Sequence, residues 1–122
     1  MSETKKAVVV QPNGSAEVIE VADDKMLATL QKAVDGYIEA VSLDEEFVMW
    51  VNEEGLFRAD LSSNYLGAIL YEEIFKVKNP INGTVVFTGG TDEEGYTLGL
   101  TDIQIAGTLA MADVAYRAKH QE

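Results

Sequence analysis

The chain has 122 residues, and its nine Lys and Arg against 21 Asp and Glu give a formal net charge of −12. This length suits one domain with its own core, so we expect a single acidic domain over residues 1–122, with residues 1–5 frayed. The absence of Cys excludes disulfides and thiolate metal sites, and the acidic surface disfavours direct binding to nucleic acid or membranes.

The first part of the chain predicts two strands and a helix. Residues 6–11 and 16–21 are rich in β-branched residues and flank Asn13-Gly14, a dipeptide typical of tight hairpin turns. Residues 23–35 begin with Asp and carry apolar residues every three or four positions, which predicts an amphipathic helix.

The middle of the chain predicts a second hairpin. Residues 37–43 and 47–51 are two strand-like runs separated by an acidic turn. The second run is apolar at every position, so we expect it to be covered on both sides and to lie centrally in the sheet. We therefore predict that Trp50, which lies in this run, is buried core rather than an exposed binding aromatic.

The last part of the chain alternates strands and helices. Residues 56–59 predict a third strand of the meander, and residues 65–76 carry apolar residues at helical spacing. Residues 84–88 are a β-branched strand, and residues 96–98 are expected to return antiparallel to it. A final helix over residues 102–119 follows a capping box.

These elements predict an α+β fold in the order ββα-βββ-α-ββ-α. We expect a mostly antiparallel sheet of about six to seven strands, with two to three helices packed over one face. No apolar run approaches the roughly 18 residues of a membrane span, and nothing is typical of a signal peptide, so a cytoplasmic location is expected.

No catalytic signature is present in the sequence. The single His120 lies two residues from the end of the chain, where an imidazole is poorly placed for a triad or a zinc site. Gly89-Gly90 lacks the Lys and the spacing of a phosphate loop. We expect no catalytic residue, metal site or cofactor; the sequence favours a non-enzymatic protein and leaves an enzyme as the open alternative.

Carboxylates are concentrated in the predicted turns. Seven acids and no basic residue lie between Lys32 and Arg58, and five acids and no basic residue lie between Lys78 and Arg117. Such turns are either solvated hairpin tips or a surface for a basic protein partner. The candidate binding residues among them are Asp44, Glu45, Glu46, Glu53 and Glu54.

Three further residues could line a pocket beside the central sheet. Glu39 shares strand parity with three large apolar residues, so it is a buried general acid, a residue at the rim, or a partner of Arg58. Trp50 and Arg58 would complete the lining.

Four segments carry a family resemblance. They are the run from Leu30 through Tyr37-Ile38-Glu39-Ala40-Val41, the turn Asn52-Glu53-Glu54-Gly55-Leu56, Asn64 ahead of a short helix, and Gly83-Thr84-Val85-Val86-Phe87-Thr88-Gly89. In these segments the chain resembles the domain of unknown function 3846 family, small bacterial and phage proteins, over residues 7–109. The resemblance implies a phage or mobile-element context and no catalytic residues.

These observations together predict a small acidic interaction protein, a phage or mobile-element accessory factor that acts on a host protein with a basic surface. One alternative is a nucleic-acid mimic that blocks a DNA-binding enzyme. Another is a small-molecule-binding protein or hydrolase with a pocket beside the central sheet. The oligomeric state is left open.

Overall fold

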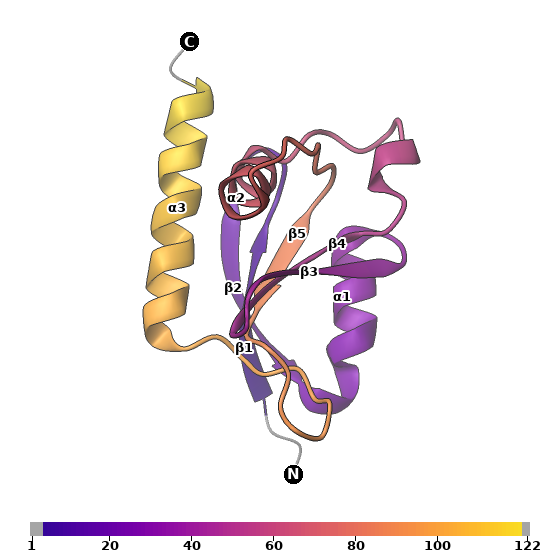
Figure 1. Cartoon of the computed structure of the whole chain (residues 1–122). Coiled ribbons are helices and arrows are strands. Elements are labelled where there is room, and N and C mark those ends of the chain that lie inside the picture. Colours follow the sequence, from indigo (N-terminus) through magenta and orange to yellow (C-terminus); the bar gives the residue numbers. More distant parts are fainter. Residues whose placement is uncertain (1–3, 121–122) are drawn as a thin grey trace.

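The computed structural model describes residues 4–120, and the elements within them form one antiparallel sheet with helices on both sides (Figure 1). In chain order they are β1 (Thr4–Val10), β2 (Ala16–Ala22), the 3-10 turn η1 (Asp23–Lys25), α1 (Met26–Val34), β3 (Ile38–Asp44), β4 (Phe47–Asn52), the 3-10 turn η2 (Gly55–Phe57), α2 (Tyr65–Phe75), β5 (Val85–Thr88) and α3 (Asp102–His120). The predicted α+β class and the antiparallel sheet are confirmed.

The sheet consists of two hairpins joined by one central strand. Its order is β2-β1-β5-β4-β3, and every neighbouring pair is antiparallel. β5 has four residues, all of them buried, and its Phe87 pairs with Val8 of β1 and Met49 of β4. β4 lies inside the sheet, as its uninterrupted apolar sequence indicates.

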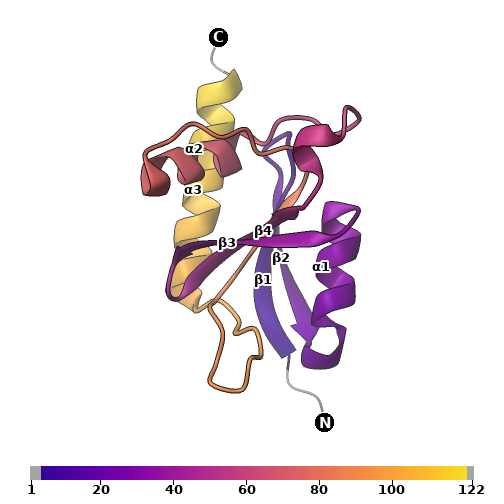
Figure 2. The same ribbon diagram turned by 45° about the vertical axis from the view of Figure 1, so that its right-hand side comes forward.

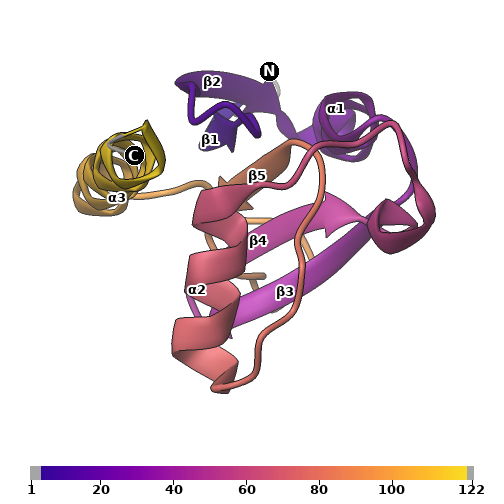
Figure 3. The same ribbon diagram turned by 90° about the horizontal axis from the view of Figure 1, so that it is seen from above.

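Helices cover both faces of the sheet, so the expectation of helices over one face is wrong. On one face, Leu30 of α1 packs in a cluster with Val86 of β5. On the other face, Leu66 of α2 and Ala112 of α3 pack in a cluster with Phe87. Figure 3 shows α1 on the opposite side of the strands from α2 and α3. The reason is that consecutive residues of a buried strand point to opposite faces, and an apolar residue at each position needs cover on each side.

The sheet has five strands rather than six or seven, because two predicted strands do not form. Residues 55–57 are a 3-10 turn, and Phe57 is 87% exposed. The return over residues 96–98 is antiparallel as expected, but it is limited to one isolated bridge between Thr91 and Thr97. In the part of the chain that the structure describes, residues 56–59 have no neighbouring strand to pair with, whereas Leu98 is hydrogen-bonded to the backbones of Gly89 and Gly90 in a pairing too short to count as a strand.

The N-terminal expectation is corrected in part. Thr4 and Lys5 belong to β1 and pair with Ala22 and Val21, so they are not frayed. Residues 1–3 lie outside the described residues.

Trp50 is half-buried, which confirms the prediction of a core position only in part. Its ring lies on the α1 side of the sheet, packed against the cluster that contains Leu30. Its Nε1 donates a hydrogen bond of 2.8 Å to Oγ1 of Thr88 on β5. A buried indole N–H needs such a partner, so this bond fixes the ring between β4 and β5.

Asn64 joins three parts of the fold from a buried position, with 1% of its surface exposed. Its Oδ1 accepts a hydrogen bond from the backbone N–H of Gly67 at 3.0 Å and so caps α2. Its Nδ2 donates to the carbonyl oxygens of Val10 and Gly83, each at 3.0 Å. Asn64, which precedes a short helix in the sequence, therefore caps that helix and anchors it to the rest of the fold.

Candidate functional site

The structure divides the candidate residues among separate regions. Glu53, Glu54 and Arg58 lie in the segment after β4, close to the end of α1. The turn that holds Asp44, Glu45 and Glu46 connects β3 to β4 at the opposite end of these strands. The two groups of acids therefore do not form one surface.

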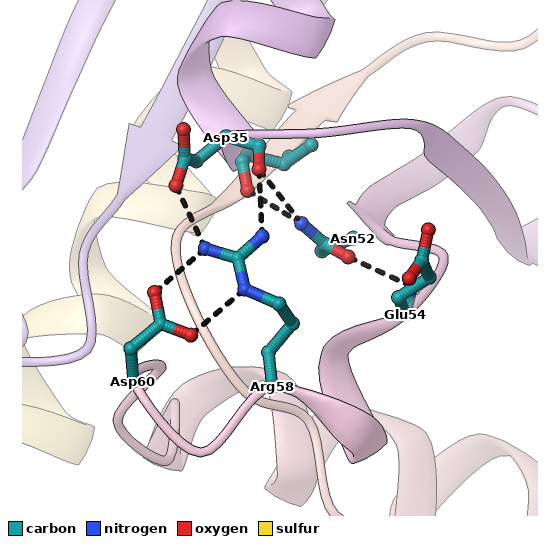
Figure 4. Close-up of polar contacts among 6 residues, drawn as sticks. Asp35, Asn52, Glu54, Arg58 and Asp60 are labelled. Atoms are coloured by element: carbon teal, nitrogen blue, oxygen red, sulfur yellow. Dashed lines mark hydrogen bonds and ion pairs between the residues drawn. The ribbon is translucent and has the colours of Figure 1, made fainter.

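Arg58 clamps the segment of residues 53–60, which we call the clamped loop (Figure 4). Its Nε and Nη2 donate to the two carboxylate oxygens of Asp60 at 2.8 and 2.7 Å. Nη2 also donates to Oδ2 of Asp35 at 2.9 Å, and Nη1 donates to the backbone carbonyl of Asp35 at 3.0 Å. The planar guanidinium suits such a fork, so one side chain ties the loop to itself and to the end of α1.

Asn52 makes a second tie between the clamped loop and α1 (Figure 4). This side chain is buried, and its Nδ2 donates to the carbonyls of Val34 and Asp35 at 2.9 and 3.2 Å. Its Oδ1 accepts from the backbone N–H of Glu54 at 2.7 Å. Asp35 adopts a left-handed conformation, with φ of 62°, and ends the helix. Asn52 therefore satisfies carbonyls that the end of α1 leaves free.

The charges of the clamp reinforce each other. Hydrogen bonds that Arg58 donates to the carboxylates of Asp60 and Asp35 raise its pKa above the usual range. The hydrogen bond from Arg58 lowers the pKa of Asp60 below its ordinary value of 3.8. Arg58 and Asp60 are thus ionised at neutral pH, and the clamp stays closed there.

The clamped loop displays two apolar side chains to solvent. Phe57 is 87% exposed and Leu56 is 57% exposed, at the tip that the Arg58 clamp supports. Glu53 and Glu54 precede this tip and are exposed as well. A large aromatic side chain on a fixed loop, with carboxylates beside it, is a typical protein-binding feature.

The turn of residues 44–46 lies beside the base of the loop of residues 91–95, and we call these two acidic segments the acidic end (Figure 2). Gly90 lies so close to the turn that a Cβ there would collide with the carbonyl oxygen of Glu45. Nε2 of Gln104, at the start of α3, donates to the carbonyl of Glu46 at 2.8 Å. The same Gln104 completes the predicted capping box with Thr101. Gln104 therefore links the turn of residues 44–46 to the start of α3.

The carboxylates of the acidic end have two roles. Oδ1 of Asp44 accepts from the N–H of Glu46, and Oδ1 of Asp92 accepts from the N–H of Glu94 at 2.9 Å, so these Asp residues shape the turns. The side chains of Glu45, Glu46, Glu93 and Glu94 are exposed. This end therefore concentrates negative charge on fixed turns.

Glu39, Trp50 and Arg58 do not share a pocket. Glu39 is exposed on the edge strand β3 and lines a cavity of about 110 Å³ with Tyr71 and Asn82 among its neighbours. Trp50 packs on the opposite, α1 side of the sheet, and Arg58 is held in the clamp. Within residues 4–120, no group of three or more His, Asp or Glu side chains is placed to hold a metal ion.

Two surfaces were missed by the sequence reasoning. One is the exposed tip of the clamped loop, because Leu56-Phe57 has the composition of a strand. The other is an open groove of about 320 Å³ between α2 and α3, lined only by apolar residues. The signal for this groove is present in the sequence as apolar residues on an outer face of α3.

The fold and these surfaces define a small acidic α+β domain whose exposed features are loop surfaces and a helix groove. None of the helices within residues 4–120 combines the length and apolar character needed to cross a bilayer. The chain belongs to the DUF3846 family, a domain of unknown function, whose family model matches residues 5–113. No curated protein and no solved structure matches it significantly. The resemblance noted in the sequence is thereby confirmed.

Proposed function

We propose that this protein acts by binding another protein through the clamped loop, without catalysing a reaction. The observation that carries the proposal is Phe57, which is 87% exposed on a loop held by the Arg58 clamp. Exposed aromatic side chains of this size are frequent energetic centres of protein interfaces. A loop that is already fixed loses little conformational freedom on binding, which favours affinity.

The charges beside Phe57 indicate the chemistry of the partner. Glu53 and Glu54 precede the tip and are exposed, whereas the charge of Asp60 is already paired with Arg58. The partner therefore offers an apolar pocket for Phe57 with Lys or Arg at its rim. The phage or mobile-element context implied by the family resemblance makes a bacterial host protein the expected partner.

The test is affinity capture from bacterial lysate, with the wild type and the Phe57→Ser variant each immobilised, followed by mass spectrometry. The matched control is Leu27→Ser, since Leu27 is 59% exposed on α1, away from the clamped loop. We expect a partner that the wild type and the control retain and that Phe57→Ser loses. Capture of the same proteins by all three would contradict the proposal.

A second candidate function is the nucleic-acid mimic, and the acidic end supports it. The turn of residues 44–46 packs there against Gly90 and is bonded by Gln104, and the exposed glutamates of this end would fit a basic groove on a DNA-binding enzyme. Binding of this kind weakens steeply as salt rises, as binding of the target to DNA does. A salt-insensitive interaction with the captured partner would exclude the mimic.

Variants in which glutamates are neutralised separate the two candidate functions. One variant replaces four glutamates of the acidic end with Gln, and the control replaces four exposed glutamates elsewhere, so both have the same net charge. A mimic predicts that only the first variant loses the partner and that duplex DNA competes for it. The first set is Glu45, Glu46, Glu93 and Glu94, and the control set is Glu17, Glu20, Glu72 and Glu73.

A further inference from the structure

The groove between α2 and α3 continues into an exposed apolar stripe along α3. Ile103 is 86% exposed and Val114 is 66% exposed, and both lie on the outward side of this helix. Gly107 and Ala110 lie between them at helical spacing and are exposed as well. Across the groove, Ile69 of α2 is 39% exposed. Small residues at the centre of the stripe allow another helix to approach closely.

The charge of this region differs from that of the rest of the protein. Residues 65–78 and 101–120 together hold four acids and four bases. Because the whole chain holds 21 acids and nine bases, the other 17 acids and five bases account for the entire net charge of −12. The α2–α3 face is thus electrically balanced, and two such faces can meet without the repulsion that the other surfaces would cause.

α3 begins with an acidic residue and ends with basic residues, so two α3 helices have complementary charges when they run antiparallel. Asp102 lies in the first turn, near Lys6, and Arg117, which pairs with Asp113 of the same helix, lies with Lys119 in the last turn. In an antiparallel pair centred on Ala110, the first turn of one copy lies beside the last turn of the other. A parallel pair would instead place like charges together, and it would align the two helix dipoles unfavourably.

We infer that this protein forms a two-fold symmetric dimer in which the α3 helices of two copies pack antiparallel and the α2 side chains close the groove. Identical partners meet through the same patch in such an interface. A stable interface buries about 800 Å² on each partner. α3 alone is roughly 28 Å long and about 10 Å wide, so residues of α2 such as Ile69 have to take part.

The charge balance favours a second copy over a basic partner at this face. A strongly basic protein would find more attraction at the acidic end or the clamped loop, where uncompensated acids lie. The dimer surface is also separate from Phe57 of the clamped loop, so the inference stands or falls independently of the proposed function.

The experiment is sedimentation equilibrium of the purified full-length chain at about 0.15 M salt over a range of protein concentrations. We expect the wild type to be dimeric and Val114→Glu to dissociate, with a dimer dissociation constant at least about tenfold higher. The control Leu27→Glu places the same charge at a similarly exposed apolar helix position and should remain dimeric. Circular dichroism confirms that each variant is folded.

A charge swap tests the antiparallel geometry. Arg117→Glu alone should weaken the dimer, and the double variant Asp102→Lys with Arg117→Glu should recover it, because opposite charges again face each other across the interface. A wild type that is monomeric at every concentration overturns the inference. So does a dimer that Val114→Glu leaves intact. If a monomeric wild type binds a different protein in a manner that Val114→Glu abolishes, the groove belongs to that partner and the dimer is refuted.

Discussion

Replacing Asn64 with Ala removes a helix cap and two donors at one buried position. The cap to Gly67 is worth about 1 kcal/mol. The two hydrogen bonds to the carbonyls of Val10 and Gly83 add about 1 kcal/mol each, because those acceptors lie in the interior and lose their partner. The expected loss of unfolding free energy is therefore about 3 kcal/mol, a large share of the 5–15 kcal/mol typical of a small domain.

The assay for Asn64→Ala is urea unfolding, followed by tryptophan fluorescence and circular dichroism. All variants are compared at one protein concentration, since self-association would make the midpoint depend on concentration. Asn64→Ser keeps a capping oxygen and loses the donors, so its loss should be smaller, about 2 kcal/mol. Asn13→Ala is the control, because its hydrogen bond to the Ser15 N–H is exposed and should be worth less than about 1 kcal/mol. A loss below about 1 kcal/mol for Asn64→Ala would refute the reasoning.

Three further outcomes are expected. Trp50→Phe should lower the unfolding free energy by about 1 kcal/mol in urea, because the indole donor to Thr88 is lost; an unchanged midpoint would contradict this. Asp60→Asn should be less stable than wild type, and the difference in unfolding free energy should be full above pH 3.8 and shrink as the pH falls below it. The reason is that the lowered pKa of Asp60 makes the folded state bind this proton at a lower pH than the unfolded state. Urea titrations at several pH values check this, and a difference that does not change with pH would contradict it. Gly90→Ala should lower the unfolding free energy by about 1–3 kcal/mol, because its Cβ would collide with the carbonyl oxygen of Glu45; a melting temperature equal to that of wild type would refute the packing argument.

Local patterns predicted most of the elements. The hairpins around Asn13-Gly14 and around the turn of residues 44–46 form as expected, since alternation and turn residues act over short distances. The uninterrupted apolar sequence of β4 already required cover on both faces, and the expectation of helices on one face overlooked this requirement.

The error at residues 56–59 arises because this segment has the composition of a strand but no partner strand among the described residues. Leu56 and Phe57 are apolar, yet they form a 3-10 turn, because Arg58 and Asn52 hold the chain away from the sheet. Neither the guanidinium clamp nor its partner Asp35 can be inferred from neighbouring residues. Contacts between side chains far apart in sequence decide this loop.

The sequence predicts which residues could bind a partner, but not which of them lie together on one surface. The acids of residues 44–46 and 92–94 are evident in the sequence, whereas the packing of the 44–46 turn against Gly90 and Gln104 is not. Strand parity indicated Glu39, and Trp50 and Arg58 were expected to line the same pocket. In the fold Trp50 pairs with Ala40 rather than with Glu39, and consecutive residues of a strand point to opposite faces, so Glu39 and Trp50 lie on different faces of the sheet.

The position of β5 has a consequence for how the chain folds during synthesis. The two hairpins are complete by residue 52, but they have no strand between them until residues 85–88 leave the ribosome. Until then, β1 and β4 each present an unpaired apolar edge, which is prone to pair with other chains. Pairing of strands so distant in sequence is slow, because a long loop has to close first. A chain interrupted before residue 85 would therefore be a pair of disconnected hairpins, liable to aggregate and unable to complete the sheet.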